Sequence, residues 1–271
     1  VKLGRQLYAT QPTFRGVLDE CNQIALSEVD EPLLSSAFDP SVSTVQENRP
    51  TRMALFAIEC ALARLWQSWG VEPSALLGEG VGEFAAASVA GVFGLADGLR
   101  LVADPSHRID YRRPCVDVIS AATGEIMEQS ICDADYWAAQ SAQLIREQIG
   151  QVSSASAESR AIASRRSPPT SCSPATLSTL IEQGCRVFVE IGLDSTIAAQ
   201  VGDPQVKDRC NDRGAIWLPS LRGGRDEWQQ LLEYLVVGRD SRRDRHAQVS
   251  PPEFERRLQG VSGKRGVEHN G

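Results

Sequence analysis

The segment from Ser74 to Gly91, SALLGEGVGEFAAASVAG, constrains the fold more than any other part of the chain. Apolar residues lead into a run of glycines, and the glycines lead into an alanine-rich stretch without proline. This order predicts a short buried strand over Ala75–Leu77, a tight turn, and a helix over Glu83–Ala90. A strand, a turn and a helix in that order are typical of α/β proteins, where such turns often hold catalytic or phosphate-binding groups.

A second strong pattern lies just before this segment. Residues Met53–Trp69 contain neither glycine nor proline and are apolar on nearly every helical face, which is typical of a buried helix. Gly70 ends this helix because glycine accepts a positive φ at little cost. Other patterns predict an entry helix over Arg5–Leu26 interrupted near Pro12, strands over Val116–Ser120, Arg186–Ile191 and Leu218–Leu221, and a helix over Trp228–Val237. Alternating short strands and helices predict an α/β layered fold.

The composition argues against several classes of function. The formal net charge of −7 and the pI of about 5.1 argue against a general affinity for nucleic acid or for anionic membranes. The 3 histidines are dispersed and the 7 cysteines form no CxxC pair, so the sequence predicts no metal site and no cofactor. No signal peptide and no long apolar run are visible, which predicts a cytoplasmic protein with reduced thiols.

Composition also divides the chain into four parts. Residues 1–150 and 179–237 hold the apolar patterns and are expected to fold. Gln151–Ser178, between them, is rich in Ser and Ala and poor in large apolar residues, which predicts a flexible linker. Gly238–Gly271 carries many charges without apolar periodicity, which predicts a disordered tail.

The glycine run allows three interpretations; it reads Gly78, Glu79, Gly80, Val81, Gly82. The first is a nucleotide-binding loop, although the spacing is G-x-G-x-G rather than G-x-G-x-x-G. The second is purely structural, because glycines at such a turn allow close packing in any protein. The third is a nucleophile elbow, G-x-S-x-G, in which Gly78 and Gly82 hold the flanking places and Gly80 holds the place of the serine.

The region Leu55–Ala103 resembles the acyltransferase domain of modular type I polyketide synthases. The family pattern is a buried helix ending L-W-x-S-W-G-V-x-P, then G-H-S-x-G-E, then A-G-V-F-x-L-x-D, and most of these letters are present here. Further similar segments follow the family order: Gly4–Cys21, Tyr111–Glu125, Asp135–Trp137, Gly184–Gly192 and Leu218–Glu233.

The resemblance implies a fold, an activity and partners. The fold is an α/β-hydrolase-like large subdomain with a ferredoxin-like small subdomain. The activity is transfer of malonyl-type units from malonyl-CoA or methylmalonyl-CoA to an acyl carrier protein. The implied partners are therefore the acyl carrier protein and neighbouring synthase domains.

The chain departs from the family where the chemistry is carried. The family reaction uses a serine nucleophile and a histidine base. Here Gly80 stands in the serine's place, and Glu79 stands in the place of the histidine just before it. Pro105 stands where the family has an arginine that grips the substrate carboxylate. His107 lies too close to the Tyr111 segment to be the family's base, and we expect it to be an exposed loop histidine.

These departures predict a degenerate, inactive acyltransferase domain in which no catalytic residue is expected. Because Ala103 is followed almost directly by Tyr111–Glu125, the large subdomain is expected to be incomplete and the small subdomain to be deleted. Such a deletion predicts exposed apolar surface on Met53–Trp69 and on the helix after the turn. The alternative is a non-catalytic module that docks carrier proteins or synthase domains through the surface around Asp135–Trp137.

Overall fold

The computed structural model describes residues 4–29, 32–34, 49–104, 106–121, 123–153, 174–192, 215–219 and 231. All of them belong to the first of two compact units, Val1–Tyr234. The predicted tail, Gly238–Gly271, lies outside the described residues. Of the predicted helix Trp228–Val237 only Leu231 is described, and it is helical and buried.

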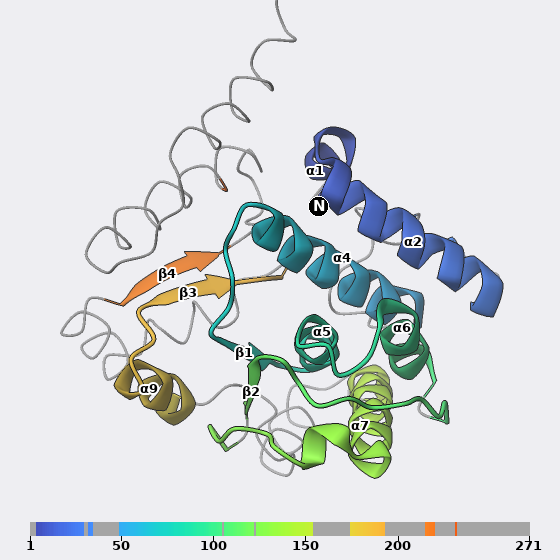
Figure 1. Ribbon diagram of the computed structural model, residues 1–271. Helices are drawn as coiled ribbons and strands as arrows, with labels where there is room; N and C mark the ends of the chain where they lie inside the picture. The colour runs from blue at the N-terminus through green and yellow to red at the C-terminus, as the bar shows by residue number, and fades with distance from the viewer. Residues whose placement is uncertain are drawn as a thin grey trace, which may run out of the picture. The chain divides into compact units, whose positions relative to one another are not determined.

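Two helices open the chain, α1 (Arg5–Thr10) and α2 (Pro12–Val29). The break falls at Pro12 as predicted, because proline at the first helical position gives up no internal hydrogen bond. Figure 1 shows α2 lying beside α4, with which it is in contact. The buried residues of α2 recur at helical spacing and form one apolar face: Phe14, Leu18, Cys21 and Ala25.

Helix α4 (Arg49–Ser68) is the buried helix that the sequence predicted. Its buried residues lie on nearly every face, from Thr51 to Trp66. Gly70 ends it at φ 79°, as expected for glycine. The N–H of Gly70 bonds to the carbonyl of Gln67 at 2.8 Å, and the N–H of Val71 bonds to that of Trp66 at 3.1 Å. These two bonds form a Schellman motif that satisfies the last carbonyls of α4.

The strands form two parallel pairs. Strand β1 (Ala75–Gly78) pairs with β2 (Asp117–Ser120) in the register Leu76↔Val118, and β3 (Val187–Glu190) pairs with β4 (Ile216–Pro219). All four strands were predicted within two residues. A parallel pair requires a crossover connection, and α5 (Val81–Val89) and α6 (Leu95–Ala103) supply the one between β1 and β2. The predicted α/β fold is thus present in the described residues.

Helices α4, α5 and α6 pack closely together. A Cβ at Gly98 of α6 would collide with the ring of Phe56 on α4, so glycine sets the distance between these helices. Arg52 is buried and its Nε donates to the carbonyl of Val102 at 3.4 Å, near the C-terminal end of α6 where a cation is favourable.

The prediction of exposed apolar surface on the central helices is wrong for the described residues. The large apolar side chains found exposed lie on none of α4, α5 and α6: Leu26, Ile126 and Val187. The residues from 104 to 116, which join α6 to β2, explain this in part. The N–H of Arg112 bonds to the carbonyl of Val92 at 2.9 Å, and Tyr111 packs edge-on against Phe93. This connection therefore covers apolar surface next to α5 and α6.

The ends of the predicted linker Gln151–Ser178 are helical. Helix α7 (Ala134–Ser153) runs through its first three residues, and α9 (Pro174–Glu182) begins before its end. The rest of the linker lies outside the described residues. Leu177 and Ile181 of α9 pack against residues from both strand pairs, namely Leu77, Phe188 and Trp217. Packing across this apolar face accounts for a helix that composition alone did not indicate.

Candidate functional site

The turn between β1 and α5 has the geometry of a strained strand-to-helix elbow. Gly80 at its tip has φ 58° and ψ −121°, and α5 begins at the next residue. A residue with a Cβ pays about 1–3 kcal/mol for such a conformation, whereas glycine adopts it readily. The N–H of Gly82 bonds to the carbonyl of Glu79 at 2.9 Å, and the N–H of Glu83 bonds to that of Gly80 at 3.2 Å. The turn is therefore closed by its own backbone.

The two flanking glycines differ in what they do. A Cβ at Gly78 would collide with the carbonyl oxygen of Gly82 and the backbone of Glu83, so strand and helix meet too closely for any side chain. Among the described residues, a Cβ at Gly82 would meet Glu59 Oε2 alone, at an ordinary 3.7 Å. The close approach of strand and helix thus explains the glycine at position 78. The described part of the chain gives no steric reason for a glycine at position 82.

The surroundings of position 80 are apolar on one side. A Cβ built on Gly80 would lie 3.7 Å from Cδ2 of Leu144, a residue of α7 that is only 5% exposed. Chain neighbours aside, no other atom of the described residues comes within 4 Å of that Cβ. A side chain at the tip would thus have one apolar neighbour and no polar group in contact with its Cβ within the described part of the chain.

A partly buried hydrogen bond joins the first turn of α5 to α7. The hydroxyl of Tyr136 donates to Oε1 of Glu83, and the sulfur of Met127 lies 3.9 Å from the same hydroxyl. Burial raises the pKa of Glu83, while the hydrogen bond from Tyr136 acts in the opposite direction. Burial and the neighbouring Glu83 raise the pKa of Tyr136, so the tyrosine stays a donor.

A second carboxyl lies beneath the turn. Oε2 of Glu59, on α4, is buried without a hydrogen-bond partner in the described structure, near Gly82. Burial raises the pKa of Glu59 to about 8, so this side chain is mostly neutral at pH 7. The adjacent thiol of Cys60 also has a raised pKa, chiefly through burial, and is a poor nucleophile. Sequence reasoning missed Glu59 because only the packed structure shows its burial.

The structure describes the other predicted positions only in part. Pro105, at the predicted clamp position, lies outside the described residues. His107 is a loop residue after α6, as expected, but it is half-buried rather than exposed. Its backbone N–H bonds to the carbonyl of Asp104 at 3.4 Å. Trp137 is fully buried and packs against Phe84 and Phe93. Within Asp135–Trp137, only Asp135 is exposed.

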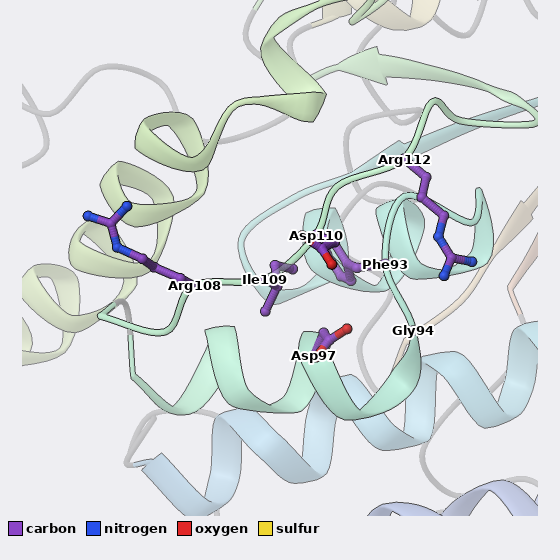
Figure 2. A pocket seen from close by; sticks show the side chains of 7 residues that line it. All are labelled: Phe93, Gly94, Asp97, Arg108, Ile109, Asp110 and Arg112. Carbon is purple, nitrogen blue, oxygen red and sulfur yellow. The ribbon is translucent and has the colours of Figure 1, made fainter.

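A shallow cavity of about 370 Å³ lies at the start of α6 (Figure 2). It is lined by Phe93, Gly94, Asp97, Arg108, Ile109, Asp110 and Arg112. Asp97 is already paired with Arg100 at 3.2 Å, and Figure 2 shows Arg108 directed away from both aspartates. None of the elbow residues Gly78–Gly82 lines this cavity. The arrangement offers mixed charge without convergent groups, so the elbow remains the candidate site.

The part of the chain that holds the elbow is similar to a known protein family. The model of the acyl transferase domain matches residues 2–112. The similarity to this family therefore covers residues 2–112 and includes the elbow. The acyl transferase match ends near the start of the Tyr111–Glu125 segment, and the later segments that resemble the family lie beyond it.

Similar sequences to this segment occur in polyketide synthases. The chain is 41% identical over 113 residues to a non-reducing polyketide synthase of Cladonia grayi, and 40% identical over 111 residues to an orsellinic acid synthase of Armillaria mellea. Each match covers about two fifths of this chain but only 5% of the relative. The predicted resemblance to polyketide synthase acyltransferases is confirmed.

Solved acyltransferase domains share the fold. The acyltransferase domain from the second module of the salinomycin polyketide synthase aligns with 99% of this chain and 75% of its own, at a TM-score of 0.67 and 22% identity. A loading acyltransferase from the avermectin synthase aligns with 88% of this chain and 95% of its own, at a TM-score of 0.63 and 19% identity. The predicted fold, an incomplete acyltransferase fold, is confirmed.

The described residues offer neither a metal-binding cluster nor a membrane-spanning helix. No group of three or more His, Cys, Asp or Glu side chains in the described ranges could hold a metal ion. No helix in that part of the chain is long and apolar enough to cross a membrane.

Proposed function

We propose that this chain is an acyltransferase-type domain that forms no acyl-enzyme. One observation carries the proposal: the tip of the elbow is Gly80, which has no side chain to accept an acyl group, in the backbone conformation described above. Acyl transfer through a covalent intermediate requires a nucleophile activated by a nearby base. The family's histidine before the nucleophile is Glu79 here, and its clamp arginine is Pro105.

Two other groups with acidic protons, one on α4 and one on α7, support the same proposal. Cys60 is buried and its pKa is raised, which keeps the thiol protonated and unreactive. The hydroxyl of Tyr136 is engaged with Glu83. Removal of the nucleophilic serine from a serine protease lowers its turnover about 10⁶-fold. We therefore expect turnover below detection.

Intact-mass analysis after incubation with malonyl-CoA or methylmalonyl-CoA tests the proposal. We expect the mass of the chain to be unchanged. The Gly80→Ala variant is the matched control, because it alters the tip without adding a nucleophile. A malonyl adduct on the native chain would refute the proposal, and peptide mapping would then identify the residue that carries it.

The alternative function is a non-catalytic module that docks an acyl carrier protein or neighbouring synthase domains. Its support is the persistence of the family fold around an elbow without a nucleophile. The surface around Asp135–Trp137 offers little for docking, because Trp137 is buried and Tyr136 is engaged with Glu83. A pull-down with purified acyl carrier protein separates the two ideas: binding without transfer supports the module, and no binding favours an inactive remnant.

A further inference from the structure

Leu144 is the side chain that a group at the elbow tip would meet first. Its Cδ2 lies 3.7 Å from a Cβ built at position 80, at ordinary van der Waals contact. Among the described residues this contact stands alone within 4 Å, apart from the chain neighbours of Gly80. Because Leu144 is 5% exposed, the wall that it forms is firmly packed rather than a mobile surface chain.

Hydrogen bonds of α7 hold this wall in place. Ser141 Oγ donates to the carbonyl of Leu101 on α6 at 2.9 Å, in a buried position one turn before Leu144. Tyr136 donates to Glu83 on α5 two turns before it. Residues four apart share a helix face, so Tyr136 and Leu144 both lie on the side of α7 that faces the elbow. The wall is therefore tied to the same helix that the elbow starts.

An apolar wall discriminates between charged and uncharged groups. A carboxylate placed against buried hydrocarbon loses solvation without gaining a partner, whereas an uncharged group of the same size loses far less. We propose that Leu144 sets the chemical selectivity of the elbow, so that a group carried at position 80 is accommodated when uncharged and disfavoured when it ends in a carboxylate. This inference deepens the function proposed above and rests on it, since malonyl is such a charged group.

A thiol introduced by Gly80→Cys makes the selectivity measurable. Iodoacetamide and iodoacetate have nearly the same shape, and only the second is negatively charged. In each case the thiolate attacks the carbon that bears iodine, a C–S bond forms, iodide leaves, and the thiol proton passes to the buffer. The exposed thiol of Cys115 in the same chain provides the reference for intrinsic reactivity. Peptide mapping by mass spectrometry gives the labelling rate at each position.

We expect the ratio of neutral to charged labelling at position 80 to exceed the ratio at Cys115 by about tenfold. Leu144→Arg should bring the ratio at position 80 down to that at Cys115 or below it. Ala139→Arg is the matched control, because it adds the same charge at an exposed position of α7 and should leave the ratio unchanged. Equal ratios at the two thiols, or equal effects of the two arginine variants, would overturn the proposal.

Two readouts keep the test decisive if the cysteine variant is unstable. Cys21 and Cys60 are buried, so they stay unlabelled while the fold is intact. If these two thiols react, the variants Gly80→Asn and Gly80→Asp compare a neutral with a charged side chain without a reagent. The asparagine variant should unfold at the higher temperature, and Leu144→Arg should reverse this order. The same unfolding temperature for both variants would overturn the proposal. A malonyl adduct on the native chain would instead refute the proposed function and leave the labelling comparison valid.

Discussion

The hydroxyl of Tyr136 donates a partly buried hydrogen bond to the carboxyl of Glu83 and so joins α7 to the first turn of α5. This contact connects a segment inside the matched acyl transferase range to one beyond it. It therefore gives the later part of the chain a direct role in holding the elbow.

Removal of that hydroxyl should destabilise the fold. Tyr136→Phe leaves the partly buried carboxyl of Glu83 without its donor. We expect a loss of about 1 kcal/mol, the lower end of the penalty for a buried group left unsatisfied. Urea unfolding of both chains measures the difference in free energy. Tyr8→Phe is the matched control, because its hydroxyl donates to Asp19 at 2.6 Å and Tyr8 is much less buried than Tyr136, so its loss should matter less. Equal losses from the two variants would contradict the role assigned to Tyr136.

The buried carboxyl of Glu59 should make stability depend on pH. Its pKa in the folded chain is about 8, above the ordinary 4.5, so the folded state keeps a proton that the unfolded state releases between these values. The stability is therefore full below pH 4.5 and falls as pH rises to about 8, by at most about 1.4 kcal/mol per pH unit from this group.

Glu59→Gln tests this dependence because glutamine stays neutral. We expect the free energy of unfolding of the variant to fall less steeply between pH 5 and pH 8, measured by urea titration at pH values about one unit apart. Glu72→Gln, at an exposed position before β1, should leave the slope as it is in the native chain. A slope that Glu59→Gln leaves unchanged would show that another group, such as Glu83, dominates.

The glycines that flank the tip should respond in opposite ways to alanine. Gly78→Ala places a Cβ against the backbone of Gly82 and Glu83 and should cost about 3 kcal/mol, toward the upper end of overpacking effects. Gly82→Ala lies in the first turn of α5 with only an ordinary contact, and should be neutral or stabilise by up to about 1 kcal/mol. Thermal unfolding of the two variants side by side decides the point, and a loss at position 82 as large as at position 78 would contradict it.

Much of the fold could be predicted because its strongest signals are local. A few neighbouring residues are enough to predict α4 from its apolar run, its end from a glycine, and the start of α2 from a proline. Helix α9 was missed because its nine residues are stabilised by packing against Leu77, Phe188 and Trp217, which lie far from it in sequence. Local composition carries no record of such contacts.

The sequence predicted the backbone turn of the candidate site, but not the side chains that surround it. The G-x-G-x-G spacing predicted the turn, because the positive φ at Gly80 and the close approach at Gly78 both favour glycine. The loss of the nucleophile stays a prediction. Leu144 and Glu59 approach the turn from α7 and α4, and nothing in their own sequence neighbourhoods indicates it. Such tertiary contacts become visible only after the chain has folded.

Restoration of the serine should not restore the reaction. Gly80→Ser combined with Glu79→His recreates the sequence of the family elbow, but the serine must accept φ 58° at a cost of about 1–3 kcal/mol. A serine hydroxyl is a weak nucleophile without a base. His107 lies in the loop after α6, where its backbone N–H bonds to the carbonyl of Asp104. The new side chain would also face the apolar wall of Leu144, which disfavours a malonyl carboxylate.

We expect no transfer of radiolabelled malonyl from malonyl-CoA to an acyl carrier protein, with Gly80→Ala plus Glu79→His as the matched control. Transfer by the serine variant at about 1 per second or faster, and none by the control, would show that a working base and clamp persist in this chain, and the proposed inactivity would then reduce to the single residue at position 80.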